Sequence, residues 1–564
     1  MKIFLLTRFY YLCGRIIVIL TMMKIIKHIV FTLFLLMMGL DIKAQEVDVF
    51  GWAENQCPTL PKGLLEAVSF TNTQCHHLTD ADYSFPADDP TAMPRAYGMM
   101  GLVRDGKGCF RENLKTVAEL SGFAEQDIVD NPSVNVLAYA KACEKVASKL
   151  NVKSDAAEDW MPVIMELSEL PLNDKNDELP MKMMLYSVYD RLGSDLKTLF
   201  GEDYGILSGA GVTVTRETDY PYAIWIPAAE CNWEQRTKEV SAVAVHYTEG
   251  TYAGCISWFQ NCDSEVSAHY VIRSYDGQVA QMVREKDKAW HIGVANGYTI
   301  GIEHEAYGDI ISFFTTAMYE SSADLVRNIC SRYSNVLSYR TFCTDTLDDG
   351  TALDYGLHNL GGEGACIQIR GHQHYPEQTH TDPGPYWNWN HYYKLINNFV
   401  MPINVGGPGI DEGDLDHLDY TDDERKIWVI RCDDDATITL DFTYFDLETD
   451  YDFLWIYDGA SVSAPQLGRW NTESPGTLTS SGNALCLEFR SDCATTSGGW
   501  RAHWTVNHPA GIGESPIVEQ EANDVAIFDI FGRRVSENEM RKGVYIIRYT
   551  MGDGRVVVRK KIYR

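Results

Sequence analysis

The chain has 564 residues, too many for one hydrophobic core, and this length predicts about three or four domains. Hydrophobic residues make up 45% of the sequence, which is ample for globular cores and argues against general disorder. The formal net charge of -31 argues against nucleic acid or an anionic membrane as the main partner, because phosphate groups are bound by clustered Lys and Arg. A neutral or zwitterionic substrate fits this charge better.

Residues 1–44 have the features of a signal region. Lysines follow Met23, an apolar run occupies residues 29–40, and the small residue Ala44 closes the segment, as in a secretory signal peptide. We expect translation to start at Met23 and cleavage to follow Ala44. The mature protein is then secreted or held at the outer cell surface, with no stable membrane span. An amino-terminal membrane anchor that includes the apolar stretch before Met23 is the alternative.

Cysteine usage agrees with export. Of the 14 cysteines, all but Cys13 lie beyond the signal region, in groups of four, six and three along the chain. In an oxidising compartment this pattern predicts disulfides mostly within domains, with one thiol left over. Cys255 and Cys262 are close enough in sequence to staple one short helix.

Residues 45–215 are predicted to form a helical domain, since residues 136–150 carry apolar side chains at helical spacing. The sequence of this helix, together with residues 64–73 and 96–102, resembles that of the lysozyme-like transglycosylases. The resemblance implies an acidic catalyst at the position of Asn72, because glycosidic bonds are cleaved with the help of a general acid. Asparagine cannot donate that proton. We therefore expect an inactive domain that binds glycan or is purely structural.

Residues 220–400 mix strand and helix patterns and predict an α/β domain. An apolar strand ends at His246, a turn contains Trp290 and His291, and a later strand ends at Glu303. Two further strands are expected, and they span residues 266–272 and 277–283.

The loop of residues 370–384 brings His372, His380 and Asp382 close together in sequence. A zinc ion that activates water takes about three protein ligands from His, Cys, Asp and Glu and keeps one position open. His246 can supply the third ligand beside two from this loop. The sequence therefore suggests a zinc hydrolase.

These motifs, in this order, resemble the zinc-dependent N-acetylmuramoyl-L-alanine amidases related to peptidoglycan recognition proteins. The resemblance implies an α/β fold with a mixed central sheet flanked by helices over residues 220–400, and peptidoglycan or muropeptides as the partner. It implies cleavage of the amide bond between N-acetylmuramic acid and L-alanine. The implied zinc ligands are His246, His372 and Asp382.

The same resemblance implies roles for four more residues. Glu303 takes a proton from the attacking water and passes it to the leaving amine. His380 stands where many of these enzymes have Lys or Thr, and it can still donate a hydrogen bond to the oxyanion. Trp290 and His291 are expected along the substrate groove.

Several alternatives stay open at this stage. Glu305 competes with Glu303 for the acid–base role, and His269 has either a site role or a core role. Structural roles are expected for three other histidines, which are His304, His358 and His374. The main functional alternative is a non-catalytic peptidoglycan recognition protein, although Asp382, which such proteins usually lack, favours an enzyme.

Residues 401–414 are predicted to be a linker because they are rich in Gly and acids. Residues 415–508 follow with alternating strand patterns and resemble a CUB module, which is a β-sandwich of extracellular proteins. The resemblance implies calcium ligands at Glu448, Asp452 and Asp492, because calcium prefers carboxylate oxygens. The alternative is an adhesion or spacer module without a metal.

Residues 509–522 are predicted to be a second linker before a strand-rich tail, residues 523–564. The tail resembles the carboxy-terminal sorting domain of the type IX secretion system and implies that secretion machinery as a partner. A small permanent β domain is the alternative.

Overall fold

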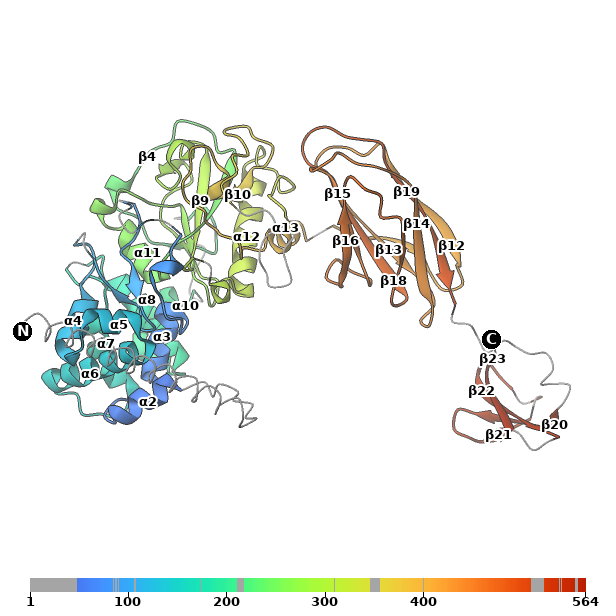
Figure 1. The fold of residues 1–564 in the computed structure, drawn as a ribbon, viewed down its shortest axis with the longest axis horizontal. Coiled ribbons are helices and arrows are strands. Elements are labelled where there is room, and N and C mark those ends of the chain that lie inside the picture. The colour runs from blue at the N-terminus through green and yellow to red at the C-terminus, as the bar shows by residue number, and fades with distance from the viewer. Residues whose placement is uncertain are drawn as a thin grey trace, which may run out of the picture.

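The computed structural model describes residues 48–84, 86, 89, 91–105, 108–173, 175–209, 218–308, 310–344, 356–398, 400–508, 522–536, 538, 540–552 and 556–563. Helices come first in the chain, followed by a mixed α/β region, a β-sandwich and a small terminal sheet (Figure 1). The predicted signal region lies outside the described residues. Within the described part of the chain, no helix is both long and apolar enough to cross a membrane.

The helical domain confirms the predicted helix-rich segment. Its longest helix begins with Pro132 and ends with Leu150. The Asn131 side chain caps its first turn by accepting hydrogen bonds from two backbone N–H groups, and Asn151, in the left-handed region, follows its last turn. The helices are α2 (Val49–Gln56), α3 (Leu64–Thr73), α4 (Asn113–Ser121), α5 (Glu125–Asp130), α6 (Pro132–Leu150), α7 (Met161–Leu167), α8 (Glu178–Arg191), α9 (Leu196–Phe200) and α10 (Tyr204–Ser208), with a small ladder of β1 (Ala96–Tyr97) and β2 (Leu102–Val103).

Asn72 is a buried residue of α3. Its amide nitrogen donates a hydrogen bond to the carbonyl oxygen of Met100 at 3.0 Å. This contact ties α3 to the turn that precedes β2.

A six-stranded mixed sheet forms the centre of the next region. Its strand order is β10-β5-β9-β6-β7-β3, and its pairs are parallel except for β6 with β7. The strands are β3 (Ile224–Trp225), β5 (Ala242–Tyr247), β6 (Tyr270–Ile272), β7 (Val279–Gln281), β9 (Thr299–His304) and β10 (Ile369–Gly371), and a separate hairpin pairs β4 (Trp233–Gln235) with β8 (Asp287–Ala289).

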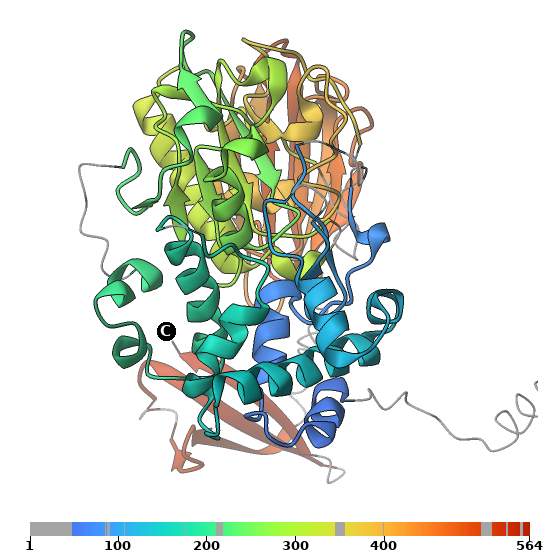
Figure 2. The same ribbon diagram turned by 90° about the vertical axis from the view of Figure 1, so that its left-hand side faces the viewer.

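Helices flank this sheet, as predicted. Every residue of β5 is buried, as expected for an inner parallel strand covered on both faces. Val243 and Val245 join a core that includes residues of α12 (Thr316–Arg332) and α13 (Trp389–Ile396). α11 (Tyr252–Phe259) packs against α8 of the helical domain (Figures 1 and 2). One hydrophobic cluster therefore runs through the helical domain and into the mixed region.

The β-sandwich has two packed sheets, with the orders β11-β13-β18-β15-β16 and β12-β19-β14-β17. Buried and exposed side chains alternate along β14 up to Phe442, as expected for a sheet with one solvated face. The strands are β11 (Ile403–Gly406), β12 (Glu412–Leu418), β13 (Arg425–Arg431), β14 (Thr437–Asp446), β15 (Phe453–Tyr457), β16 (Gln466–Trp470), β17 (Thr477–Thr479), β18 (Ala484–Arg490) and β19 (Gly499–Asn507).

Half of the predicted linker of residues 401–414 lies in strands instead. β11 pairs in parallel with β13, and β12 pairs with β19, so both belong to the sandwich. Gly and acidic residues suggested a linker because they are uncommon in strands, but edge strands tolerate them. The second predicted linker lies outside the described residues except for Ala522, which begins β20.

The disulfides correct two expectations. Cys262 bonds with Cys231 instead of Cys255, so no staple spans α11. Cys366 of the mixed region bonds with Cys493 of the sandwich, so this disulfide joins two domains. The odd number of cysteines in the sandwich therefore reflects, in part, a bond to another domain.

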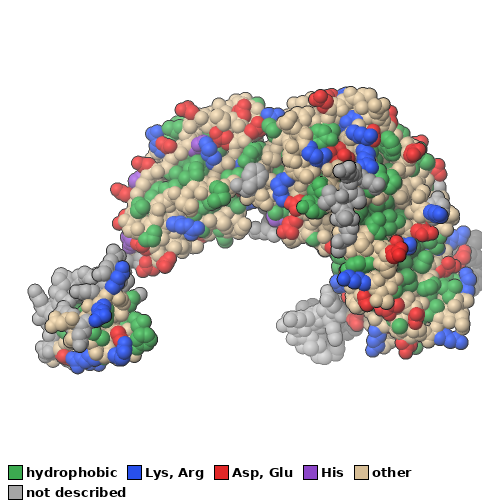
Figure 3. All heavy atoms as spheres, turned by 180° about the vertical axis from the view of Figure 1, so that it is seen from behind, with side chains coloured by type: hydrophobic (Ala, Val, Ile, Leu, Met, Phe, Trp, Pro, Cys, Tyr) green, Lys and Arg blue, Asp and Glu red, His purple; other side chains and the backbone are tan. Residues whose placement is uncertain are grey.

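The tail forms a four-stranded antiparallel sheet, which confirms its strand-rich prediction. Its order is β21-β20-β22-β23, with β20 (Ala522–Asp529), β21 (Arg534–Val535), β22 (Gly543–Met551) and β23 (Val556–Tyr563). On the face of the molecule in Figure 3, Lys and Arg side chains are interspersed with Asp and Glu.

Candidate active site

Two neighbouring strands deliver the first two predicted metal ligands to one edge of the sheet. His246 is the penultimate residue of β5, and His372 directly follows β10, which runs parallel to β5 with Gly371 opposite Val245. The loop after His372 returns, and the backbone N–H of Gln373 donates a hydrogen bond to the carbonyl oxygen of Asp382 at 3.2 Å. This topology brings together three ligands that are up to 136 residues apart in the sequence.

The three side chains converge closely. His246 Nδ1 lies 3.0 Å from Asp382 Oδ2 and 3.1 Å from His372 Nδ1, and His372 Nδ1 lies 3.0 Å from Asp382 Oδ1. Ligands held at 2.0–2.1 Å around a tetrahedral zinc ion are ~3.3 Å apart. The three groups are therefore spaced almost as such an ion requires.

The chemistry of this donor set also fits zinc. Burial lowers the pKa of His246 to about 4, so its ring is neutral at pH 7. Burial raises the pKa of Asp382, but the charge of His372 and the hydrogen bonds from both histidines outweigh this effect and hold the pKa far below its usual value. Asp382 Oδ1 is buried and lies 3.0 Å from His372 Nδ1. A neutral imidazole and a carboxylate are what a metal ligand set needs.

Further side chains hold the outer nitrogen of each histidine. His246 Nε2 lies 2.9 Å from His291 Nδ1, and His291 Nε2 lies 3.2 Å from Thr299 Oγ1. His372 Nε2 lies 2.6 Å from Gln378 Oε1. Since an amide oxygen only accepts, His372 donates from Nε2 and keeps Nδ1 for the metal. Such outer partners fix the tautomer and orientation of metal-binding histidines.

Glu303 lies across from these ligands. It pairs with His246 in the β5–β9 register, so both residues point to the same side of the sheet. Its Oε2 atom is buried and has no hydrogen-bond partner. Burial raises the pKa of Glu303 well above the usual value, and the charge of Asp382 adds to the shift. A carboxyl group with a raised pKa beside a metal site can receive and release a proton.

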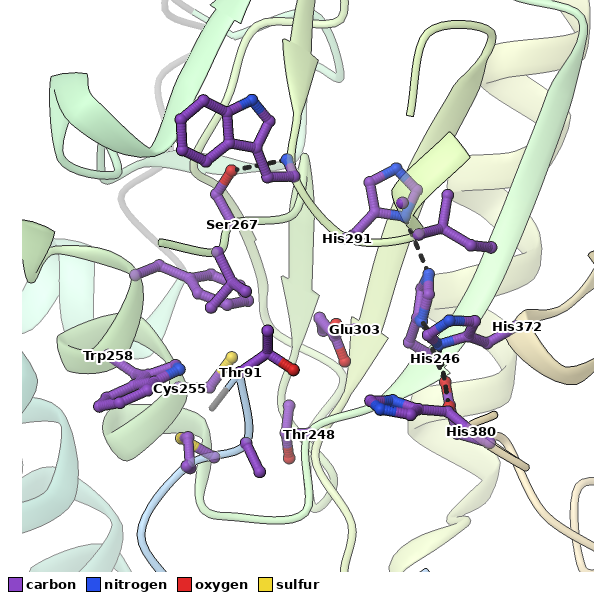
Figure 4. Close-up of a pocket in the computed structure, with 18 of the residues that line it drawn as sticks. Thr91, His246, Thr248, Cys255, Trp258, Ser267, His291, Glu303, His372 and His380 are labelled. Atoms are coloured by element: carbon purple, nitrogen blue, oxygen red, sulfur yellow. Dashed lines mark hydrogen bonds and ion pairs between the residues drawn. The ribbon is translucent and has the colours of Figure 1, made fainter. Parts of the chain in front are cut away.

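Figure 4 shows Glu303, His246, His372 and His380 around one cavity. The cavity has a volume of about 330 Å³. Trp290 and His291 line it as well, and His291 also contacts His246. The ring of His380 lies 5.0 Å from that of His372. All seven residues predicted for this site therefore border one cavity.

The structure separates the alternatives that the sequence left open. Glu305 lies just beyond β9 and accepts hydrogen bonds from the backbone N–H groups of Tyr252 and Ser274, both at 2.8 Å. That is a structural role. His269 and His304 are fully buried and bonded to backbone atoms, and His374 accepts a hydrogen bond from the N–H of Gly371.

Sequence reasoning missed several residues of the cavity. Thr91, Ala92 and Met93 of the helical domain line it, and Gln378 holds a ligand from within the predicted loop. In the sequence, Gln378 lies between His372 and Asp382, and this position is the signal that could have identified it as a site residue. For the three residues of the other domain, the local sequence carries no sign that they approach the site.

The three acids predicted to bind calcium also meet. Ligand atoms of Glu448, Asp452 and Asp492 lie within 4.8 Å of one another at one end of the sandwich. Asp452 accepts hydrogen bonds from the N–H of Asp492 at 2.8 Å and from the hydroxyl of Tyr420 at 2.5 Å. Burial raises the pKa of Asp452 to about 6, and neighbouring acids contribute to the shift. Glu448 Oε2 is buried without a hydrogen bond.

Two regions of the chain are similar to known protein families. The profile described as N-acetylmuramoyl-L-alanine amidase matches residues 236–385, and the profile described as CUB domain matches residues 415–504. Human cubilin is 36% identical over 90 residues, which cover 15% of this chain and 2% of that protein. The solved structure of PlyL is 17% identical in sequence to this chain. The match covers 31% of this chain and 96% of PlyL, with a TM-score of 0.21.

A relative from Achromobacter lyticus shows to which family this chain belongs. N-acetylmuramoyl-L-alanine amidase A of this organism is 39% identical over 180 residues, which make up 32% of this chain and 96% of the relative. The segment matched by the amidase profile includes all three predicted metal ligands, Glu303 and His380. The chain therefore belongs to the N-acetylmuramoyl-L-alanine amidase family and carries a CUB domain after the amidase region.

Proposed function

We propose that this protein is a secreted, zinc-dependent hydrolase of peptidoglycan that cleaves the amide bond between N-acetylmuramic acid and L-alanine. The observation that carries the proposal is the convergence of His246, His372 and Asp382 within about 3 Å of one another, with Glu303 on the same side of the sheet. The amidase relative and the family profile support the same reaction.

Zinc held by the three ligands would polarise the substrate carbonyl and lower the pKa of water from about 15.7 to ~7. Glu303 takes the proton of the attacking water and later delivers it to the leaving amine of L-alanine. His380 donates a hydrogen bond to the carbonyl oxygen as negative charge develops there. Trp290 offers an apolar wall for the sugar or the stem peptide. The products are a free lactyl carboxylate and a peptide with a new amino terminus.

The reaction is tested with the purified protein and a defined muropeptide. Mass spectrometry is expected to show L-alanine-terminated peptides and free muramic-acid chains, and a chelator is expected to stop their formation. Metal-dependent binding without new amino termini would instead identify the alternative, a recognition protein that holds wall fragments without cutting them.

Calcium is proposed for the cluster of Glu448, Asp452 and Asp492. Three carboxyl groups this close repel one another when ionised, and the raised pKa of Asp452 reflects burial and that repulsion. A hard divalent cation would remove the repulsion. At pH 7.5, calcium is expected to raise the thermal midpoint of the wild type but not of Asp452→Asn. Equal midpoints for the wild type with and without calcium would refute the assignment.

Export through the type IX secretion system is proposed for the sheet β20–β23. The similarity of its sequence to sorting domains of that system supports this role, and the predicted signal region supports passage across the inner membrane first. A chain truncated before Ala522 is expected to stay inside the producing cell, whereas secretion of the truncated chain would favour a permanent β domain.

A further inference from the structure

One loop of the helical domain contacts the amidase region, and hydrogen bonds join the two ends of this loop. The Tyr83 hydroxyl donates a hydrogen bond to the carbonyl oxygen of Ala96 at 2.7 Å and accepts one from the N–H of Ala96 at 2.8 Å. The Arg95 guanidinium stacks 4.7 Å from the centre of the Tyr83 ring. We call the described residues between these two anchors, which are residues 84, 86, 89 and 91–95, the arm. Loops with joined ends of this kind are compact and often functional.

The arm is docked on the loop that follows β5, the strand of His246. Both the backbone N–H and the hydroxyl of Ser84 donate hydrogen bonds to Glu249 Oε1 at 2.6 Å. Met93 packs so closely on Gly250 that a Cβ atom there would lie 2.1 Å from Met93 Cε. This end of the arm is therefore fitted to the amidase surface.

Asp89 of the arm contacts His380, which lines the cavity. Asp89 Oδ1 accepts hydrogen bonds from Thr91, from the backbone N–H at 2.8 Å and from the hydroxyl at 2.6 Å. Its other oxygen, Oδ2, lies 3.2 Å from His380 Nε2. The two side chains are only 17% and 19% exposed, so solvent competes weakly for this contact. One carboxylate oxygen of Asp89 is thus held within the arm, and the other contacts the His380 ring.

We propose that Asp89 is a positioning residue for amide hydrolysis, and that the helical domain thereby completes the active site of the amidase region. Asp89 sets the rotation of the His380 ring toward the substrate carbonyl, and Thr91, Ala92 and Met93 form one wall of the cavity. The proposal rests on the proposed function, because His380 acts on the substrate only if the site hydrolyses it. Misplacing a group that contacts the reacting carbonyl by about 1 Å can cost ~100-fold in rate.

The test measures kcat and KM of full-length Asp89→Ala and Asp89→Asn with a defined muropeptide. Asp155→Asn, at an exposed acid of the same domain, is the matched control. Asp89→Ala is expected to lower kcat about 10–100-fold while KM, bound zinc and the thermal midpoint stay within about twofold or a few degrees. Asp89→Asn keeps an oxygen that can accept from His380, so it is expected to recover part of kcat.

The outcomes separate the two proposals. If the wild type hydrolyses the muropeptide and Asp89→Ala keeps the same kcat, the positioning role is refuted and the proposed function stands. If Asp89→Ala loses zinc or stability, Asp89→Leu decides, because it has a similar shape without an acceptor oxygen, and an unchanged kcat in that variant refutes the role. If the wild type makes no product with zinc bound, the proposed function fails, and the role of Asp89 fails with it.

Discussion

At the scale of single residues, the site depends on which protonation states the fold imposes. Burial keeps His246 neutral, and its partners keep Asp382 ionised, so both are ready to bind a cation. Burial instead raises the pKa of Glu303, which lines the same cavity. A bound cation would lower that pKa again and favour the carboxylate, which is the form that accepts a proton from water.

Asp382→Asn is expected to remove the metal and the activity together. The amide is a poor substitute for an anionic ligand, so zinc binding should weaken and turnover should fall by ~100-fold or more. Zinc content and muropeptide hydrolysis check this result, with Asp263→Asn at an exposed position of the same domain as the control. Full turnover by a folded Asp382→Asn would show that the ligand assignment is wrong.

Glu303→Gln should separate chemistry from metal binding. The variant is expected to keep zinc and lose ~100–10,000-fold in kcat, because the proton of the attacking water has no acceptor. Glu305→Gln provides the contrast, since Glu305 accepts two backbone hydrogen bonds and is expected to affect the thermal midpoint more than kcat. The reverse pattern in the two variants would assign the acid–base role to Glu305.

Glu249 should make the protein less stable as the pH rises. Burial raises its pKa from 4.5 to about 8, so between these values the native state binds a proton that the unfolded chain releases. Its stabilising contribution is complete below about pH 4.5 and is lost as the pH rises through about 8. Glu249→Gln should therefore raise the thermal midpoint more at pH 8.5 than at pH 5.5, whereas the exposed control Glu320→Gln should not. An equal change at both pH values would contradict this account.

At the scale of elements, local patterns were enough to predict much of the site. The apolar strand before His246, the strand of Glu303 and the loop with Asp382 each carry their signal within a few residues. Contacts between distant segments were not predictable in this way. Asp89 and His380 are 291 residues apart, and Cys366 and Cys493 are 127 residues apart. Only tertiary packing brings such pairs together.

Strand β18 shows how an element can hold two domains in place. Glu488 is fully buried and accepts hydrogen bonds from Arg425 Nε at 2.8 Å and Arg490 Nε at 3.0 Å. Arg425 also donates to the carbonyl oxygen of Asn397, and Arg490 donates to Asn390 Oδ1 at 2.8 Å, both in the amidase region. The acid therefore orients two arginines that bridge to the neighbouring domain.

Glu488→Gln should destabilise the junction between the amidase region and the sandwich. Two buried guanidinium groups would lose their counter-charge, a change that typically costs ~3–5 kcal/mol. Thermal unfolding and limited proteolysis check this, with the exposed Glu473→Gln as the control. If Glu488→Gln unfolds like the wild type, the ion cluster does not stabilise the junction.

At the scale of the whole molecule, the amidase region is joined to both neighbours. The helical domain shares a hydrophobic cluster with it, and the sandwich is linked to it through Cys366–Cys493 and the salt bridge between Arg340 and Asp423 at 3.1 Å. Figure 1 shows the small C-terminal sheet beyond the sandwich, at the other end of the chain from the helices. The cavity with the candidate metal ligands thus lies in a region that is joined to both of its neighbours, which favours a fixed arrangement of those ligands.

The most direct test of the central claim is a titration of metal-depleted protein with zinc, followed by the initial rate of muropeptide hydrolysis. We expect no product without metal and a rate that rises linearly to a plateau at one zinc per chain. Hydrolysis by the metal-free protein, or zinc bound at one equivalent without any hydrolysis, would contradict it.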